Sequence, residues 1–460
     1  MRRENEFLYM RLYGILKEQI LTGLIQPGNY LLPENELCRC YSMSRNSVRK
    51  ALEQLQNDGL VIKRPGLGTM VPVDLAIQPS DRSVLRILAP YPAHFVDNGL
   101  PSIIKAFSKL HPHVDVQLLS LPALHFWDSF QTCCHMGMTP DVVLVSDLHL
   151  TDRDRLAAFT DLRDPLSSQL DFIYPKLLNH FRYDDQLIAA PLTFTPTFLA
   201  FNPTLFASEG IPLPTEDWTL DDFCDAARRL TQEQDARIIR YGLSIFPQVS
   251  RWPVFALQNQ EAGAFDGLTA DSLRKALSLI QDLLYHQRAA IMYPQHDTNP
   301  FLYEKSAMTL TTLFEMSSWK DRSIDFTPEA APLPFGPTKA TLLQANSLMI
   351  PMSANHPELA LAFVQIALEP DVQRTMCEST PFLSVLPQVN EATRTRQLLH
   401  ALNVQDPFMD NNLFLYELFG ESAMDELKDE LALFWLGLET ADAVTDAVAK
   451  AVAGAWAKPQ

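Results

Sequence analysis

The side chains best suited to chemistry lie in a short segment that follows Ser44. Arg45 and Arg49 are four residues apart, so on a helix both guanidinium groups project from one face. An arginine can bind guanine O6 and N7 through two hydrogen bonds, and an asparagine such as Asn46 can bind adenine in the same way. Lys50 suits a phosphate, because its ammonium is a flexible point charge. The segment therefore indicates contact with base edges in the major groove of DNA.

The helix that would carry these side chains has an apolar stripe on its other side. Ser44 is a suitable N-cap, and Asp58-Gly59 would stop the helix at about Asn57. For any one of these charges, a solvated polar face on a surface helix is the simpler interpretation. The order of the surrounding elements decides between that interpretation and DNA binding. The stripe consists of Val48, Ala51, Leu52 and Leu55.

The surrounding elements have the order of a winged helix. We expect helices over 7–22 and 34–41 before this segment, and strands over 60–64 and 69–73 after it. Three helices and a hairpin within about 70 residues are typical of that fold. Gly66 lets the hairpin backbone approach a duplex closely, while Lys63 and Arg64 add positive charge beside it.

Residues 9–72 resemble the DNA-binding domain of the GntR family of bacterial regulators. The resemblance implies that Arg45, Asn46, Ser47 and Arg49 contact DNA and that Gly66 lies near the wing tip. The full set of candidate DNA-binding residues is Ser44, Arg45, Asn46, Ser47, Arg49, Lys50, Lys63, Arg64 and Gly66. It also implies a homodimer on double-stranded operator DNA of two-fold symmetry. The family commonly has Leu-Pro-Ser-Glu before its second helix, whereas this chain has its proline one position later, in 31–34. The matching segments are 16–23, Pro27-Gly28, 34–37, 44–52 and 66–69.

From residue 84 onward, strands alternate with helices, which predicts a parallel α/β sheet. We therefore expect a multi-domain fold: an N-terminal α+β winged helix-turn-helix over 1–73, a linker over 74–83 and a two-lobed α/β domain over 84–460. The short linker favours mechanical coupling between the two parts. The strands are expected over 84–89, 114–119, 141–146, 187–191 and 198–202, and the helices over 100–110, 124–135, 219–232, 270–287, 357–368, 370–378 and 421–452.

This larger part resembles the solute-binding proteins of bacterial ABC importers, particularly the oligosaccharide-binding, periplasmic-binding-protein-like (type II) kind. The resemblance implies a carbohydrate ligand in the crevice between two lobes, beyond the strand ends. The similarity covers about 84–455 and is weakest over 236–300. The segments that carry it are 126–131, 139–143, 187–191, 201–206, 209–212, 218–223, 331–337 and 348–351.

Candidate ligand residues follow from the chemistry of sugars, whose faces stack on aromatic rings and whose hydroxyls need polar partners. Some candidates lie at strand ends and others at positions corresponding to ligand-facing loops. For each aromatic residue, packing in the core is the alternative. The candidates are Tyr91, Trp127, Ser146, Asp147, Phe194, Thr195, Trp252, Met316, Trp319, Asn346 and Phe382.

Composition and charge restrict the possible classes of protein. The 460 residues are 47% hydrophobic and 20% charged, which is a globular composition for two or three domains. The net charge of −18 argues against DNA binding by the whole chain. Residues 1–75, however, hold ten Lys/Arg against eight Asp/Glu, so the remainder carries about −20. DNA contact is therefore expected only at the N-terminal part, with the acidic remainder repelling the duplex.

Several further functions are not expected. We find no signal peptide, no apolar run long enough for a membrane span, and no C-x-x-C pair among six cysteines. These features predict a reduced, cytoplasmic protein without a bound metal. No G-x-S-x-G, Walker, G-x-G-x-x-G or H-E-x-x-H sequence is present, so neither an enzyme nor a cofactor is expected.

The sequence thus favours a ligand-responsive transcriptional regulator that senses a sugar or oligosaccharide and controls uptake or catabolic genes. Two alternatives remain open. The sensor domain could have lost ligand binding and act in dimerisation, because a fold does not establish a site. The chain could also be a transport solute-binding protein, for which an export signal would be needed.

Overall fold

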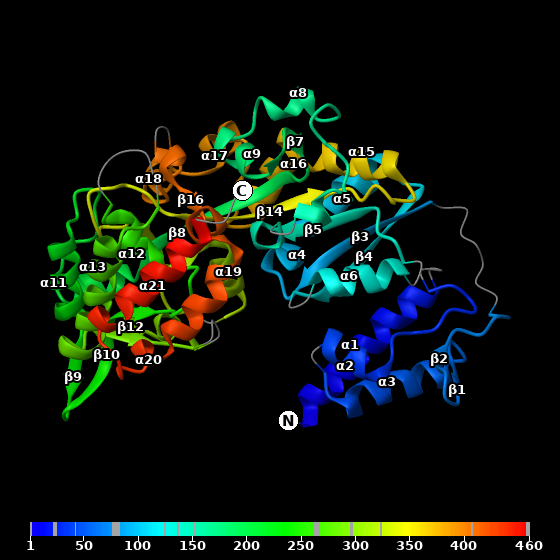
Figure 1. Cartoon of the computed structure of the whole chain (residues 1–460), viewed down its shortest axis with the longest axis horizontal. Helices are drawn as coiled ribbons and strands as arrows, with labels where there is room; N and C mark the ends of the chain where they lie inside the picture. Colours follow the sequence, from blue (N-terminus) through cyan, green and yellow to red (C-terminus); the bar gives the residue numbers. More distant parts are fainter. Residues whose placement is uncertain are drawn as a thin grey trace.

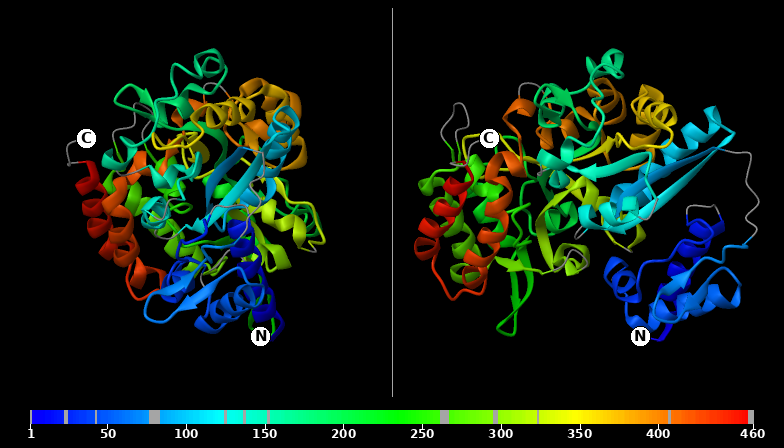
Figure 2. Two further views of the ribbon diagram at one scale, coloured as in Figure 1. Left: turned by 90° about the vertical axis from the view of Figure 1, so that its right-hand side faces the viewer. Right: turned by 45° about the vertical axis from the view of Figure 1, so that its right-hand side comes forward.

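The computed structural model describes residues 2–21, 25–41, 43–75, 83–123, 126–135, 138–150, 153–260, 267–294, 298–322, 324–405 and 408–456. A small N-terminal body lies beside a much larger body with two lobes (Figure 1). The two further views keep the small body on the same side of the large one (Figure 2). The predicted multi-domain architecture is confirmed.

The N-terminal body is the predicted winged helix. Its hairpin is antiparallel, with Arg64 opposite Gly68, and Tyr30 forms an isolated bridge to Met70. The paired strands are shorter than the predicted spans, and Leu60 and Val61 lie before the ladder and are buried in the core. The elements are α1 (Arg2–Leu21), α2 (Glu34–Cys40), α3 (Arg45–Asn57), β1 (Ile62–Arg64) and β2 (Gly68–Met70).

Helix α3 forms where the sequence predicted it, for local reasons. The Ser44 hydroxyl accepts a hydrogen bond from the Ser47 backbone N–H at 3.2 Å, which satisfies one of the free donors at the helix start. The apolar stripe then packs against α1 and α2. Burial of each large aliphatic side chain stabilises the fold by roughly 1.5–3 kcal/mol. The stripe residues Val48, Ala51, Leu52 and Leu55 are all at most 1% exposed.

One continuous sheet runs through both lobes of the large body. Its order is β11-β10-β12-β8-β14-β5-β3-β4. β3, β4 and β5 are parallel, whereas β8 and β14 run antiparallel to their neighbours along this path and are almost entirely buried. These two strands join the lobes, and we call them the hinge. The bounds are β3 (Ser83–Tyr91), β4 (Val114–Pro122), β5 (Val142–Ser146), β8 (Ala190–Phe201), β10 (Arg237–Ile245), β11 (Ala290–Met292), β12 (Ser306–Thr312) and β14 (Leu342–Met349).

Each lobe has its own layer of helices over the sheet. The first lobe, around β3–β5, carries α4 (His94–Asn98), α5 (Leu100–Leu110), α6 (Phe126–His135), α15 (Pro357–Ala367) and α16 (Pro370–Ser379). The second lobe, around β10–β12, carries α11 (Leu220–Leu230), α12 (Pro253–Gln258), α13 (Ala270–Gln281), α19 (Leu415–Glu430), α20 (Ala432–Trp435) and α21 (Ala441–Trp456). The short helix α14 (Leu313–Ser317) follows β12 and packs against α4 of the first lobe.

Short elements fill the connections between these layers. In the first lobe and at the hinge they are η1 (Asp147–His149), α7 (Arg153–Leu156), α8 (Ser167–Leu170), α9 (Pro175–His180), β6 (Arg182–Tyr183) and β7 (Gln186–Leu187). Further along the chain they are α10 (Pro203–Ser208), β9 (Gln232–Gln234), η4 (Pro300–Tyr303), η5 (Ser318–Asp321), β13 (Glu329–Ala331), β15 (Leu383–Ser384), α17 (Pro387–Thr393), α18 (Arg396–Ala401), η6 (Phe408–Asn411) and β16 (Leu413–Phe414).

Four further predicted elements differ from the structure. The strand predicted over 198–202 is the end of a longer strand, β8, whose start includes residues 190–191 of the strand predicted over 187–191, because the residues between pair with β14. The single helix predicted over 421–452 is α19, α20 and α21, interrupted at Gly437, whose φ of +71° is incompatible with a right-handed helix. The helix predicted over 270–287 is α-helical only to Gln281 and continues as a π-helical turn.

The predicted linker over 74–83 falls mostly outside the described residues, which omit 76–82. Strand β3 begins at Ser83. In the part of the chain that the structure describes, every helix is too short or too polar to cross a bilayer.

Candidate DNA-binding helix and ligand cavity

Helix α3 presents most of the predicted DNA-contacting side chains to solvent. Arg45, Asn46, Arg49 and Lys50 are all exposed along one side of the helix. Ser47 is only 4% exposed, and its hydroxyl lies 3.0 Å from that of Ser44. The exposed side is therefore a continuous polar surface of the type that enters a major groove, whereas Ser47 contributes to the cap.

Two of these cations already have partners within the winged helix. Arg49 Nε donates to Glu34 Oε2 at 2.8 Å, which ties α3 to the start of α2. The Lys50 ammonium lies 5.7 Å from the centre of the Tyr9 ring. Both pairs are at the surface, where such contacts are weak and easily exchanged. Only Nε of Arg49 is held by Glu34, so its Nη N–H groups can still donate to a base while the pair stays in place.

The hairpin supplies a second exposed surface. Lys63 and Arg64 of β1 are exposed, as is Gly66 at the turn. Gly66 has a φ of +77°, and an added Cβ there would meet no atom within 4 Å. The tip is therefore open, and the glycine is required by the backbone conformation rather than by a neighbouring atom.

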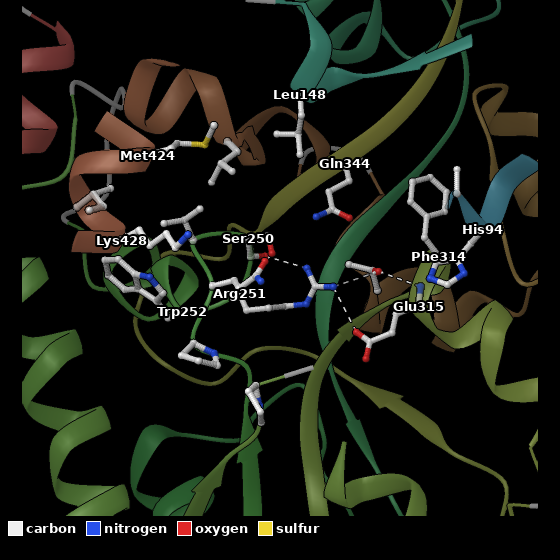
Figure 3. Close-up of a pocket in the computed structure, with 18 of the residues that line it drawn as sticks. His94, Leu148, Ser250, Arg251, Trp252, Phe314, Glu315, Gln344, Met424 and Lys428 are labelled. Carbon is white, nitrogen blue, oxygen red and sulfur yellow. Dashed lines mark hydrogen bonds and ion pairs between the residues drawn. The ribbon is translucent and has the colours of Figure 1, made fainter. Parts of the chain in front are cut away.

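The second candidate site is a cavity of about 730 Å³ between the lobes. It is lined by the start of α4, Leu148 of η1, the loop before α12, Pro294 after β11, the end of β12 with α14, β14 and the C-terminal helices, so seven separate stretches of the chain build it (Figure 3). The lining residues are Ala93, His94, Phe95, Leu148, Pro247, Gln248, Val249, Ser250, Arg251, Trp252, Pro294, Thr312, Phe314, Glu315, Gln344, Asn346, Leu415, Met424, Leu427, Lys428, Leu431 and Trp435.

A buried ion pair forms part of the cavity wall. Arg251 Nη2 and Glu315 Oε2 are 3.3 Å apart, and each side chain is only 3% exposed. Arg251 Nη1 donates to the Ser250 carbonyl at 3.0 Å, and the Thr311 hydroxyl donates to Glu315 Oε2 at 3.0 Å. A buried pair needs such additional hydrogen bonds because both charges have lost water. The pair is visible at the centre of Figure 3.

Two of the predicted ligand residues line this cavity, namely Trp252 and Asn346. Trp252 directly precedes α12. Asn346 lies on β14 two residues after Gln344, so the side-chain amides of Gln344 and Asn346 are on one face of the strand. The remaining predicted residues lie outside the lining. They are Tyr91, Trp127, Ser146, Asp147, Phe194, Thr195, Met316, Trp319 and Phe382.

Three of these residues instead hold the turn that follows β5. Trp127 packs against Phe126, Phe130 and Phe159, and its indole N–H donates to the His149 carbonyl at 2.8 Å. Ser146 bonds His149 Nδ1 through both its backbone N–H and its hydroxyl. Burial lowers the pKa of His149 to about 4, which keeps its ring neutral.

Asp147 is 1% exposed and anchors the same turn to β14. Its Oδ1 accepts the Ala345 backbone N–H at 2.9 Å. Burial raises the pKa of the Asp147 carboxyl to about 6, and the nearby charge of His180 opposes that rise. This carboxyl therefore faces the hinge strands and is shielded from solvent.

The remaining candidates pack in the core or at its edge. Phe194 contacts Tyr174, with ring centroids 5.3 Å apart, and the Thr195 hydroxyl accepts the Leu313 backbone N–H at 2.8 Å. Trp319 packs on Phe301. Phe382 packs between Phe95 and Phe314, Met316 is half-buried against the first-lobe core, and Tyr91 is half-buried at the end of β3.

The sequence reasoning did not select several lining residues, including His94, Arg251, Gln344 and Met424. Two signals were available. Gln344 and Asn346 are polar residues two apart in an otherwise apolar strand. Met424, Leu427 and Leu431 have helical spacing. Neither signal distinguishes a cavity wall from a core contact without the tertiary structure.

The described residues contain no group of three His, Cys, Asp or Glu side chains placed to hold a metal ion.

Together these features define a two-lobed binding protein joined to a winged helix. Residues 102–398 match the family of bacterial extracellular solute-binding proteins, and residues 8–71 match the bacterial regulatory proteins of the gntR family. The chain therefore belongs to the solute-binding protein family and carries a GntR-family domain at its N-terminus.

Similar proteins cover the two parts separately. The first 70 or so residues are 39% identical to a probable fructoselysine utilization operon transcriptional repressor of Escherichia coli K12, over 70 residues that make up 15% of this chain and 29% of the relative. They are 43% identical over 54 residues to the arabinose metabolism transcriptional repressor of Halalkalibacterium halodurans, which is 12% of this chain and 14% of that protein. The chain thus spans less than a third of the length of these curated relatives.

Solved structures match the large body. An ABC substrate-binding protein from Listeria monocytogenes in complex with cycloalternan has a TM-score of 0.65 at 16% identity, covering 82% of this chain and 100% of that one. A solute-binding protein from Thermotoga lettingae bound with α-D-tagatose has a TM-score of 0.68 at 16% identity, covering 81% of this chain and 99% of that one. At this identity the likeness establishes the fold.

Proposed function

We propose that this protein is a sugar-responsive transcriptional regulator. A ligand binds in the cavity between the lobes, and the winged helix binds operator DNA as one half of a homodimer. The observation that carries the proposal is the presence, on one chain, of a large inter-lobe cavity and of a helix that exposes Arg45, Asn46 and Arg49. A protein that binds DNA acts where the DNA is, which supports a cytoplasmic location.

The target genes are proposed to encode uptake or breakdown of the same ligand. Relatives of the winged helix are named as repressors of fructoselysine utilization and of arabinose metabolism, which supports a role in sugar catabolism. A ligand shifts the DNA-binding equilibrium only to the extent that it binds one lobe arrangement better than another. Closure of the lobes around the cavity would provide that difference.

The proposal is tested by titrating the full-length protein with a panel of monosaccharides and oligosaccharides while following its thermal unfolding. At a concentration of about 100 times Kd, a ligand adds about 2.7 kcal/mol to the free energy of unfolding. A binding sugar should also change the affinity for an operator selected from random duplexes. A protein that binds DNA but responds to no sugar would instead have a sensor used only for dimerisation.

A further inference from the structure

The inter-lobe cavity has two chemically different sides. One side is apolar and consists of Met424 and Leu427 of α19, Leu431 directly after it, and Trp435 of α20. Leu427 and Leu431 are at most 1% exposed, so the accessible surface of this side comes mainly from Met424 and Trp435. These residues are three or four positions apart, so they form one stripe along the helices. Leu148 of the first lobe also faces the cavity and is 38% exposed. A polar ligand alone would leave this side without a partner.

The opposite side is polar but nearly uncharged. Gln344 and Asn346 provide amide donors and acceptors from one face of β14. Arg251 and Glu315 neutralise each other. Lys428 lies at the same end as Met424 in Figure 3 and is exposed to solvent, where its charge is screened. The polar side therefore suits hydroxyl groups.

We infer that the cavity binds an uncharged amphiphile: a hydroxylated ring held by Gln344 and Asn346, joined to an apolar group that packs on the half-buried Met424 and Trp435. A glycoside with an alkyl or aryl aglycone has this chemistry. The inference rests on the proposed function and narrows it from sugars in general to substituted sugars.

The test compares methyl and n-butyl glycosides of glucose, galactose, mannose and arabinose by calorimetric titration of the full-length protein. Each buried methylene improves affinity by about fourfold, so the butyl form of the binding sugar should be at least about tenfold tighter. Met424→Gln should abolish this preference and leave the methyl form unchanged. Leu433→Gln, an exposed leucine outside the lining, is the matched control and should keep the preference.

Equal affinity of methyl and butyl forms, or a preference that survives Met424→Gln, would overturn the inference and leave the proposed function in place. If neither these glycosides nor the free sugars bind, the proposed function fails as well.

A separate observation concerns the contact between the winged helix and the first lobe. The two surround a small hollow of about 30 Å³, and buried residues from both sides belong to one hydrophobic cluster. We call this contact the seat. Its lining is almost entirely apolar: Leu16, Gln19, Ile25, Leu31, Leu32, Leu37 and Tyr41 from the winged helix, and Leu119, Ser120, Leu121, Cys133 and Met138 from the lobe.

The seat covers one face of the first-lobe sheet at its last strand. β4 lies at the end of the strand order, yet its Leu119 and Leu121 are only 4% and 5% exposed. Leu31 and Leu37 of the winged helix are equally buried and belong to the same continuous hydrophobic core as these strand residues. Figures 1 and 2 show α1 and α2 beneath β4 and α6. Such a buried apolar contact favours a fixed arrangement over a loose tether.

We infer that the winged helix and the first lobe move as one body through the seat, so that lobe closure would reorient α3 relative to the second lobe. The linker then need not transmit the motion. Inserting ten Gly/Ser residues into 76–82 should leave the radius of gyration in small-angle X-ray scattering unchanged. The same insert combined with Leu32→Glu or Ser120→Glu, both half-buried in the seat, should enlarge it by several per cent.

Leu110→Glu, an exposed leucine at the end of α5, is the matched control and should behave like the insert alone. The inference is overturned if the insert by itself expands the protein, or if both seat variants stay compact.

Discussion

Replacing Asp147 with asparagine separates a structural role of this carboxyl from the ligand-binding role that the sequence suggested. Its pKa of about 6 lies roughly two units above the ordinary value for aspartate, and each unit corresponds to about 1.4 kcal/mol. Between about pH 4 and pH 6 the unfolded chain ionises at this position while the folded protein keeps the proton. The free energy of unfolding of the native protein should therefore fall by up to about 3 kcal/mol as the pH rises through this range, and then level off.

Asparagine cannot ionise, and its Oδ1 can still accept the Ala345 N–H. Asp147→Asn should therefore lack this decline, so that its stability relative to the native protein rises by up to about 3 kcal/mol between pH 4 and pH 7. Urea unfolding across this range measures the difference, and Asp164→Asn, whose carboxyl is 93% exposed, is the control. A pH-independent difference would refute the burial argument. Weaker sugar binding by the variant, with unchanged stability, would instead favour a ligand role.

Three further predictions concern the winged helix and the second lobe. Arg45→Ala and Arg49→Ala should each weaken binding to a selected operator by about fivefold to 150-fold in fluorescence anisotropy, and equal affinity would remove these residues from the groove. Lys50→Ala should weaken binding evenly across DNA sequences and reduce the slope of affinity against salt by about one, whereas a change in sequence preference would contradict a phosphate contact. Gly242→Ala should lower the free energy of unfolding by about 1–3 kcal/mol, because its Cβ would lie 2.0 Å from the Ala227 carbonyl oxygen. An unchanged melting temperature would contradict that packing.

Local sequence patterns predicted the elements whose causes are local. The Ser44 cap and the stripe around Leu52 place α3 within a residue of its observed bounds, and the helix predicted over 100–110 is α5. Both depend on interactions within a few residues. The joining of two predicted strands into β8 and the break at Gly437 were missed, because the first depends on pairing with β14 and the second on a left-handed backbone that many glycines do not adopt.

The residues that line the candidate ligand site were harder to predict from the sequence. Trp127, Trp252 and Trp319 look alike in the sequence, but only Trp252 lines the cavity. A side chain's exposure is set by the segments that pack around it, and these are far away along the chain. Asp147, for example, is covered by the turn's contact with Ala345, almost 200 residues later.

The sequence by itself determined the order of the two parts and the exposed cations of α3, since periodicity, capping and charge act over short distances. The class of each part followed from its resemblance to a known family. Only the tertiary structure decided which polar and aromatic side chains meet between the lobes, that one side of the cavity is apolar, and that the winged helix packs on apolar side chains of β4. These properties arise where segments separated by up to hundreds of residues are brought together, and local sequence patterns do not predict such long-range contacts.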